Sequence, residues 1–388
     1  MEAIALANIL AAGEDSRHQF KVNITNSDAM AAEMAAFANT AGGVLIIGVD
    51  DSGAVIGLNA TDIARLNQMV SNVASQSVRP AINPVTENLY IEEKLVMVVT
   101  IAEGLNKPYM DNQGIFWVKS DADKRRVTAR EELQRMFQVA ALLHADEIPV
   151  RGSSVRDLDI DYFENFFRRQ YGHQIEDLPI SLTQLLNNMN LMKNEELNIS
   201  GMLLFGKQPQ FKLPAFIVKA VAYWGTEITA QTYMDSRDIT GKLADVFQQS
   251  LNFLLSTIHS KQGGQGFNSI GEPEIPRVVL EELLVNALIH RDYFVSAPIR
   301  LFVFKNRVEI ISPGHLPNNL TVENIKYGNS NMRNPVLASF ATSLLPYRGI
   351  GSGIMRALEH YPEIDFFDDR ENNLFRVVIH RKELSMKY

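Results

Sequence analysis

The sequence predicts an α/β protein of two or three domains. Its 388 residues exceed the usual size of a single domain. Short apolar runs bounded by glycine or aspartate, such as the run at 44–49, alternate with longer segments that can form helices, such as 27–40. With 46% hydrophobic and 21% charged residues, the composition is that of an ordinary globular protein.

The first predicted domain covers residues 1–143. Gly42 and Gly43 separate its first expected helix from a buried strand. Thr128 and Glu131 have the spacing of a capping box, which predicts that a helix begins there. After a polar segment at 14–21, we expect helices at about 27–40, 61–76 and 129–143, and strands at 44–49, 95–101 and 115–119.

The second predicted domain is a middle α/β segment at 156–262. The residues before it, 144–155, include Pro149, Gly152 and two serines, which predicts a linker. Within the middle segment we expect helices at 159–170 and 241–260, and strands near 201–205 and 215–223.

The third predicted domain covers 263–388 and follows a flexible break rich in glycine and glutamine at 261–266. Its first helix, up to residue 290, is apolar on nearly all sides, as buried helices are. After it we expect a hairpin of strands at 299–304 and 307–311, a loop-rich segment at 315–347, a helix at 351–361 and a strand at 374–380.

Three polar residues interrupt the apolar helix that ends at residue 290. Glu282, Asn286 and His290 follow one another at i, i+4 and i+8, so they share one side of the helix. A buried carboxylate or amide is costly unless a partner satisfies it. A hydrated metal ion bound to a polyphosphate is one such partner.

A glycine-rich string precedes the helix expected at 351–361. Gly349, Gly351 and Gly353 would let backbone N–H groups approach a phosphate at the start of that helix. Such a string alone usually indicates a tight turn. After the polar residues of the preceding helix, it favours a nucleotide site.

Composition excludes several classes of protein. The net charge is −8, and residues 1–140 hold 12 basic against 17 acidic residues, so nucleic-acid binding would need a local basic face. The absence of cysteine excludes disulfides and thiolate metal sites. No run of 18 apolar residues predicts a membrane span, and the N-terminus lacks the basic segment of a signal peptide, so we expect a cytoplasmic location.

Four motifs occur in order in the third domain: Glu282–Tyr293, Arg307–Gly314, Asn331–Pro335 and Gly349–Gly353. They resemble the N-box, first glycine motif, lid and second glycine motif of the GHKL-type ATPases, which include histidine kinases and gyrase-like enzymes, and most closely their RecG-related branch. The resemblance implies a two-layer α/β sandwich that binds ATP and Mg²⁺. The residues implied in cofactor binding are Asn286, His290, Ser312, Gly314, Arg333, Gly349, Gly351 and Gly353.

Two of these residues have implied chemical roles. Glu282 would be the catalytic residue that polarises the attacking water, and the amide oxygen of Asn286 would be a Mg²⁺ ligand. Binding of ATP without hydrolysis would use the same residues, so an ATPase activity stays open. Structural roles are the alternative: a buried Asn that caps a neighbouring strand, a His bonded to backbone, and an exposed loop Arg.

The first domain carries another set of family motifs. Gly13-Glu14, Phe20-Lys21, the stretch 36–43 and the stretch 45–51 are similar to the AlbA-like domain that is shared with Schlafen proteins. This resemblance implies nucleic-acid binding, with DNA as the expected partner. The basic residues placed for phosphate contact are Arg17, Lys21, Lys124, Arg125 and Arg126, for which a solvated face is the alternative.

Two positions depart from the family patterns. Schlafen-like nucleases hold a divalent metal with carboxylates, and the one expected before Phe20 is replaced here by Gln19, leaving Glu14 with Asp50 or Asp51. GHKL domains place an aspartate before the first glycine motif to bind the adenine amine. Ser312-Pro313 stands there instead, which leaves the nucleotide identity open.

The sequence therefore predicts an ATP-binding and DNA-binding transcriptional regulator that forms homo-oligomers. Nucleotide state would control nucleic-acid binding or assembly through the lid at 315–347. Two alternatives remain. One is a metal-dependent nuclease of the Schlafen type in the first domain, and the other is a non-catalytic scaffold that has lost nucleotide binding.

Overall fold

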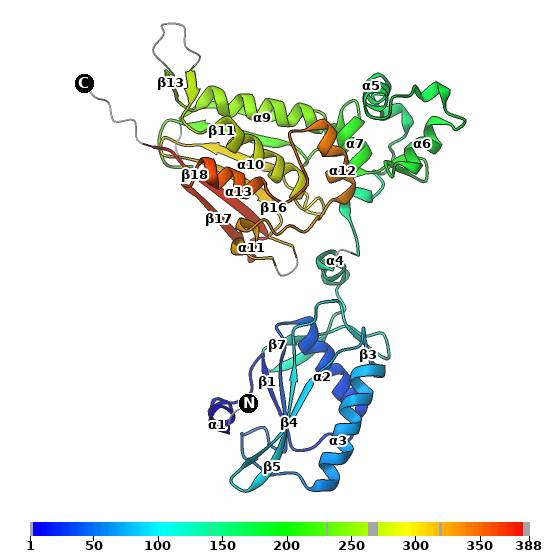
Figure 1. The fold of residues 1–388 in the computed structure, drawn as a ribbon, viewed down its shortest axis with the longest axis vertical. Helices are drawn as coiled ribbons and strands as arrows, with labels where there is room; N and C mark the ends of the chain where they lie inside the picture. Colours follow the sequence, from blue (N-terminus) through cyan, green and yellow to red (C-terminus); the bar gives the residue numbers. More distant parts are fainter. Residues whose placement is uncertain (1–2, 141, 230–231, 263–270, 318–319, 383–388) are drawn as a thin grey trace, which may run out of the picture. The chain divides into compact units, whose positions relative to one another are not determined.

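The computed structural model divides the chain into two compact units, Met1–Leu143 and His144–Tyr388 (Figure 1). Both units mix helices and strands, which confirms the predicted α/β class. The structure describes residues 3–140, 142–229, 232–262, 271–317 and 320–382.

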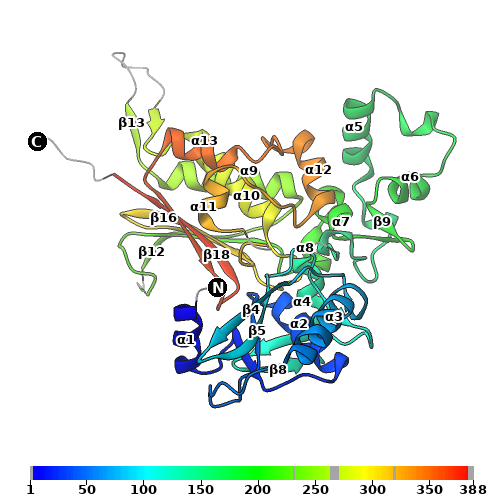
Figure 2. The same ribbon diagram turned by 60° about the horizontal axis from the view of Figure 1, so that its bottom comes forward.

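The first unit is built around a four-stranded sheet with the order β1-β2-β5-β4. β1 and β2 are parallel, whereas β2–β5 and β5–β4 are antiparallel. Helices α2 (Ser27–Asn39) and α3 (Ala60–Asn72) pack on one face, and α1 (Ala3–Ala12) packs on the other (Figures 1 and 2). The strands are β1 (His18–Lys21), β2 (Gly43–Ile47), β4 (Val85–Ile91) and β5 (Lys94–Ile101).

Shorter elements complete the first unit. A hairpin of β7 (Trp117–Ser120) and β8 (Asp123–Arg126) lies against α2, where Asn39 Nδ2 donates to the Trp117 carbonyl at 2.8 Å. The remaining elements are a π-helical turn at Val73–Ser77, the paired β3 (Val78–Arg79) and β6 (Met110–Asp111), and α4 (Arg130–Val139).

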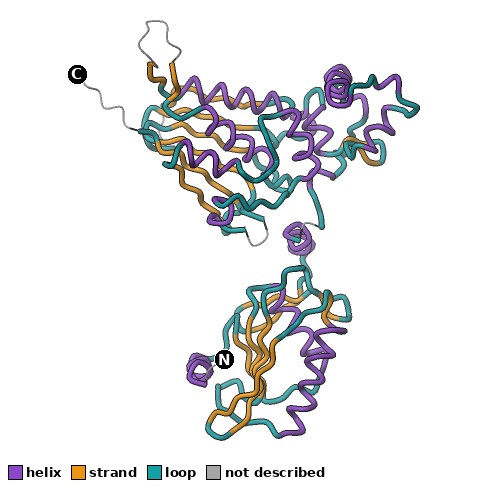
Figure 3. The backbone as a smooth tube through the Cα atoms, viewed as in Figure 1, coloured by secondary structure: helices purple, strands orange, loops and turns teal. Residues whose placement is uncertain are grey.

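The second unit contains a six-stranded sheet with the order β12-β11-β15-β16-β18-β17. β11 and β15 are parallel, and the other neighbouring strands are antiparallel. Helices α9 (Leu243–Thr257), α10 (Arg277–His290) and α13 (Gly353–His360) lie on one face, so that this part has two layers (Figures 2 and 3). The strands are β11 (Val218–Tyr223), β12 (Tyr233–Ile239), β15 (Ile299–Val303), β16 (Arg307–Pro313), β17 (Ile364–Asp369) and β18 (Leu374–His380).

Smaller elements flank this sheet. They are α5 (Ile160–Tyr171), α6 (Leu182–Asn188), β9 (Met192–Lys193), β10 (Glu196–Leu197), α7 (Ile199–Phe205), α8 (Pro209–Lys212), β13 (Ser260–Gln262), β14 (Gly271–Pro273), α11 (Val322–Lys326) and α12 (Pro335–Leu344), with 3-10 turns at Ala145–Glu147, Val155–Asp157 and Ile175–Asp177.

The middle segment does not form a unit of its own. Strands β11 and β12, which come from it, belong to the same sheet as the C-terminal strands, and one hydrophobic core spans both. Residues 144–155, expected as a linker, also lie in the second unit. Val150 N–H donates to the Leu197 carbonyl at 2.8 Å, and Asp146 is fully buried.

Several local predictions are wrong. Residues 201–205 belong to helix α7, which Asn198 caps by accepting from Gly201 N–H at 2.8 Å. All residues of α7 are buried, so its sequence lacks the periodicity that separates a helix from a strand. The expected capping box at Thr128 is absent, because α4 begins after Ala129 and has no side-chain cap. The segment 315–347 contains two helices, α11 and α12, and the break at 261–266 lies largely outside the described residues.

Candidate functional site

Helix α10 carries the polar residues of an open pocket in the second unit. Its apolar side chains are buried in the core, whereas Glu282, Asn286 and His290 line the pocket. The pocket encloses about 1070 Å³, including its solvent-open part. The other polar and glycine residues that line it are Ser312, Gly314, His315, Asn329, Ser330, Asn331, Arg348, Gly349, Gly351, Ser352, Gly353 and Arg356.

Glu282 forms an ion pair with Arg356. Glu282 Oε1 contacts Arg356 Nη2, and only 7% of the Glu282 side chain is exposed. Its other oxygen lies where a side chain on Gly353 would begin, so the carboxylate closely approaches the start of α13 and would have to move if a larger residue stood there. The predicted catalytic carboxylate therefore lies between a guanidinium and a helix N-terminus.

Asn286 is oriented by its own helix. Its Nδ2 donates to the Glu282 carbonyl at 2.8 Å, and no hydrogen bond from the described residues reaches its Oδ1. An amide oxygen is a suitable ligand for Mg²⁺. The residues present thus fit a Mg²⁺ ion, with Asn286 as the protein ligand.

His290 and Arg333 are joined by a hydrogen bond beside the pocket. Burial, together with the charge of Arg333, lowers the pKa of His290 to about 4, so the imidazole is neutral near pH 7. Arg333 donates to the carbonyls of His290 at 3.4 Å and His315 at 2.7 Å, and burial lowers its pKa. Arg333 is not among the residues that line the pocket, and its contact with a cofactor stays a prediction.

The loop before α13 depends on glycine. Gly349 and Gly351 have φ angles of +70° and +76°. A side chain on Gly351 would overlap the carbonyl oxygen of Gly328, which belongs to the lid segment. Glycine therefore allows the lid and the loop to approach each other closely.

The opposite end of the pocket is largely apolar. Ser312 Oγ donates to the Ala287 carbonyl at 3.2 Å, so its hydroxyl proton is already used. A planar base could lie here against hydrophobic side chains. These include Leu283, Ala287, Ile310, Leu316, Ile325, Phe366, Phe375 and Val377.

Sequence reasoning missed one arginine of this pocket and left the role of another open. Arg356 follows the second glycine motif by one turn of α13, but its pairing with Glu282 depends on the approach of two distant helices. Arg348, for which phosphate contact and a solvated loop position were both open from the sequence, is exposed and lines the pocket. Its position directly before Gly349 was the available signal.

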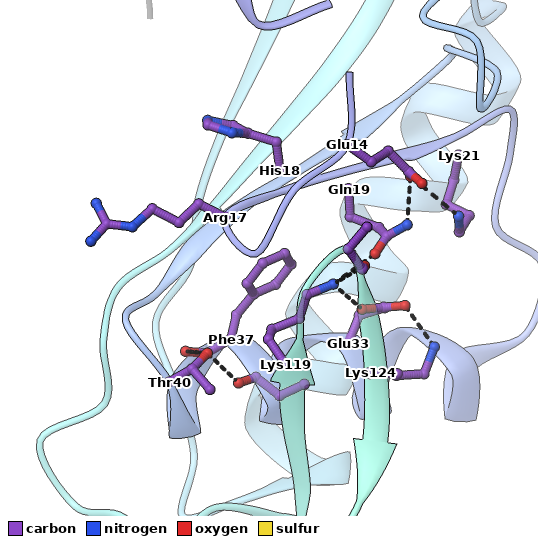
Figure 4. A network of polar contacts seen from close by, with 12 residues as sticks. Glu14, Arg17, His18, Gln19, Lys21, Glu33, Phe37, Thr40, Lys119 and Lys124 are labelled. Carbon is purple, nitrogen blue, oxygen red and sulfur yellow. Dashed lines mark hydrogen bonds and ion pairs between the residues drawn. The ribbon is translucent and has the colours of Figure 1, made fainter. Parts of the chain in front are cut away.

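A second polar cluster lies in the first unit (Figure 4). Glu33 of α2 is buried and pairs with Lys124 Nζ at 2.6 Å and Lys119 Nζ at 3.9 Å. Only 1% of the Lys119 side chain is exposed, and burial lowers its pKa while Glu33 opposes that shift. Lys119 Nζ also donates to Gln19 Oε1 at 2.7 Å and lies 5.0 Å from the centre of the Phe37 ring.

The same cluster includes the carboxylate expected to hold a metal. Glu14 Oε1 accepts from Gln19 Nε2 at 2.5 Å and from Phe20 N–H at 2.6 Å, and Lys21 lies 3.7 Å away. Lys21 is also 3.8 Å from Asp51, whereas Asp50 accepts from Ser52 and Ala54 in its own turn. Ammonium groups thus lie where a cation would bind, and within the described ranges no group of three or more His, Asp or Glu could hold a metal ion.

The basic residues predicted to contact phosphate differ in whether their side chains already have partners within the chain. Arg125 pairs with Glu132 at 2.6 and 2.9 Å, and Lys124 pairs with Glu33. Arg126 stacks 5.1 Å above the Trp117 ring. Arg17 is exposed, and in the described parts of the chain no ion pair or hydrogen bond involves its guanidinium (Figure 4).

The fold defines a two-unit α/β protein with an open pocket in its second unit. Residues 14–128 match the family described as "Schlafen, AlbA_2", and residues 296–379 match the one described as "Putative ATP-dependent DNA helicase recG C-terminal". The chain therefore joins a Schlafen AlbA_2 domain to a RecG-related C-terminal ATPase-like domain. The second match begins after α10, so Glu282 and Asn286 lie outside it.

Two solved structures are similar over different lengths. A crystal structure of a protein from Corynebacterium diphtheriae is 21% identical and covers 98% of this chain and 80% of that chain, with a TM-score of 0.47. The solution structure of the N-terminal domain of a "Putative ATP-dependent DNA Helicase RecG-related Protein" from Nitrosomonas europaea is 24% identical. It covers 34% of this chain and 96% of that chain, with a TM-score of 0.24. No curated protein matches the chain.

None of the helices in the described residues is both long and apolar enough to cross a membrane.

Proposed function

We propose that this protein binds a Mg²⁺-nucleotide, with ATP as the first candidate, in the pocket beside α10 and α13. The observation that carries the proposal is the meeting of Asn286, Glu282 and the glycine loop around one open volume. Backbone N–H groups at the start of α13 can receive phosphate oxygens, and Asn286 Oδ1 can ligate Mg²⁺. When bound, the metal would neutralise phosphate charge.

We further propose that nucleotide occupancy regulates nucleic-acid binding by the first unit, with DNA as the expected partner, in a protein that forms homo-oligomers. The lid segment supports this idea, because the turn that follows α11 and the glycine loop approach each other closely at Gly328 and Gly351. A ligand that binds one arrangement of this segment better than another would shift its population. The same site would also serve ATP hydrolysis, with Glu282 as the catalytic residue.

Titration calorimetry of ATP with Mg²⁺ into the wild type and Asn286→Ala tests the nucleotide site. We expect micromolar binding by the wild type and its loss in the variant. Asn187→Ala is a matched control, because Asn187 makes the same 2.8 Å bond to the carbonyl four residues earlier on an exposed helix surface. No heat with any Mg²⁺-nucleotide would overturn the proposal.

The regulatory part needs a separate measurement. Binding of labelled duplex DNA should differ between the nucleotide-free and ATP-saturated wild type, and Asn286→Ala should remove the difference. If the wild type binds ATP but has the same DNA affinity with and without it, the regulatory proposal is wrong and the nucleotide site stands. The polar cluster around Lys119 gives no support to the alternative of a metal-dependent nuclease.

A further inference from the structure

We infer that Arg356 is a phosphate-binding residue of the pocket and that the Glu282 carboxylate occupies it until a polyphosphate arrives. The inference rests on the proposed nucleotide site and adds to it a competition between an internal and an external anion. The ion pair between Glu282 and Arg356 lies inside the pocket lining, not beside it.

The position of the carboxylate is the first argument. Glu282 is 93% buried at its side chain, one oxygen contacts the guanidinium, and the other lies against Gly353 at the start of α13. The site that a phosphate oxygen would use therefore already holds a negatively charged oxygen from the chain itself. An incoming phosphate must displace this carboxylate or share its partners.

The state of the guanidinium is the second argument. Arg356 Nε is buried and has no hydrogen-bond partner in the described structure, so the pair with Glu282 leaves part of its donor capacity unused. A guanidinium has five N–H donors in a fixed fork that suits a phosphate as well as a carboxylate. Arg356 can thus exchange one anion for the other without leaving the pocket.

The charges around the pocket favour such an exchange. Arg348 also lines it, His290 is neutral near pH 7, and Glu282 is the carboxylate in the lining. With Glu282 paired to Arg356, the remaining charge near the glycine loop is positive and attracts a polyphosphate. Once Arg356 binds phosphate, Glu282 loses its partner and becomes a free carboxylate next to the bound ligand.

Four proteins measured with Mg²⁺-ATP test the competition: the wild type, Glu282→Gln, Arg356→Gln and the double variant. Glutamine keeps the shape of Glu282 but removes its charge, so Glu282→Gln should bind ATP about tenfold more tightly. Arg356→Gln should bind most weakly, because it loses a phosphate contact and leaves Glu282 unpaired. The double variant should lie between these two, and Arg356→Lys should keep part of the wild-type affinity.

Controls separate a phosphate contact from a merely structural ion pair. Inorganic tripolyphosphate should repeat the gain seen with Glu282→Gln, whereas adenosine should bind all variants equally. Glu281→Gln is the matched control, because Glu281 pairs with Arg277 at 2.7 Å on the same helix but does not line the pocket. Thermal unfolding of each variant checks that the fold is retained.

Each outcome decides between the two proposals. If the wild type binds ATP and Asn286→Ala does not, but Glu282→Gln binds no more tightly than the wild type, the competition is wrong and the nucleotide site stands. If neither the wild type nor Glu282→Gln binds any Mg²⁺-nucleotide, both are overturned.

Discussion

The polar cluster around Lys119 and the pocket around Glu282 both contain buried charged groups, but the two places differ in how these groups are paired. In the first unit, Glu33 and Glu14 are paired with lysine and glutamine side chains of the chain itself, although Oε2 of Glu33 accepts no hydrogen bond and lies 3.9 Å from Lys119 Nζ. In the second unit, the polar groups surround an open volume, and Asn286 Oδ1 and Arg356 Nε are left without partners among the described residues. Family motifs mark both places, but the open volume lies beside the groups of the second unit.

The largest expected effect is the loss of stability when the closed cluster is broken. Glu33→Ala leaves two lysine ammonium groups without their shared carboxylate, one of them almost fully buried. Removing one partner of a buried pair typically costs about 3–5 kcal/mol. Urea unfolding of a Trp224→Phe background measures this, because Trp117 of the first unit is then the one tryptophan of the chain.

An exposed ion pair in the same unit provides the control. Glu132 pairs with Arg125 at the surface, where half of the Arg125 side chain is exposed. Glu132→Ala should cost about 1 kcal/mol or less. Equal, small losses in both variants would mean that the Lys119 cluster is not the stabilising network that its burial suggests.

A smaller effect is expected from the glycine loop of the open pocket. Gly351 and Gly172 have similar φ angles, +76° and +73°, so the backbone strain of alanine should cost about 1 kcal/mol of stability at either position. A side chain at Gly172 meets open space, whereas one at Gly351 overlaps the Gly328 carbonyl. Only Gly351→Ala should therefore weaken ATP binding, by about tenfold or more.

Calorimetric titration of both glycine variants distinguishes the two contributions. If Gly172→Ala weakens ATP binding as much as Gly351→Ala does, the loss reflects general destabilisation of the second unit. In that case the contact between the lid and the glycine loop has no special role in the site.

The pocket residues that were predicted from the sequence belong to local patterns along the chain. Glu282 and Asn286 share a helix at i and i+4, and spacing alone places them on one side. The glycines before α13 are also a local signal. The predictions that were wrong depend on tertiary packing. Helix α7 is buried all round, and its short apolar run was taken for a strand.

The electrostatic partners could not be predicted in the same way. Lys119 stands in a stretch of polar and charged residues, which would suggest exposure. In the fold its ammonium group is buried and contacts Gln19 and Glu33. Arg356 resembles an ordinary helix-surface arginine until α13 packs beside α10. Both pairings join segments that are distant in sequence, and the charges of a buried site are assigned only when such segments meet.

The smallest expected effect concerns nucleic-acid binding by the first unit, and it applies the same distinction between free and satisfied charges. Arg17 is free, so Arg17→Gln should weaken DNA binding and reduce the slope of log affinity against log salt by about 1. Arg125 is held by Glu132, and the charge-conserving pair Arg125→Gln with Glu132→Gln should leave the slope unchanged. Fluorescence anisotropy across a salt series measures both. A fall in slope in the double variant alone would mean that Arg125 exchanges its carboxylate for a phosphate, and that a satisfied charge at the surface can still serve a ligand.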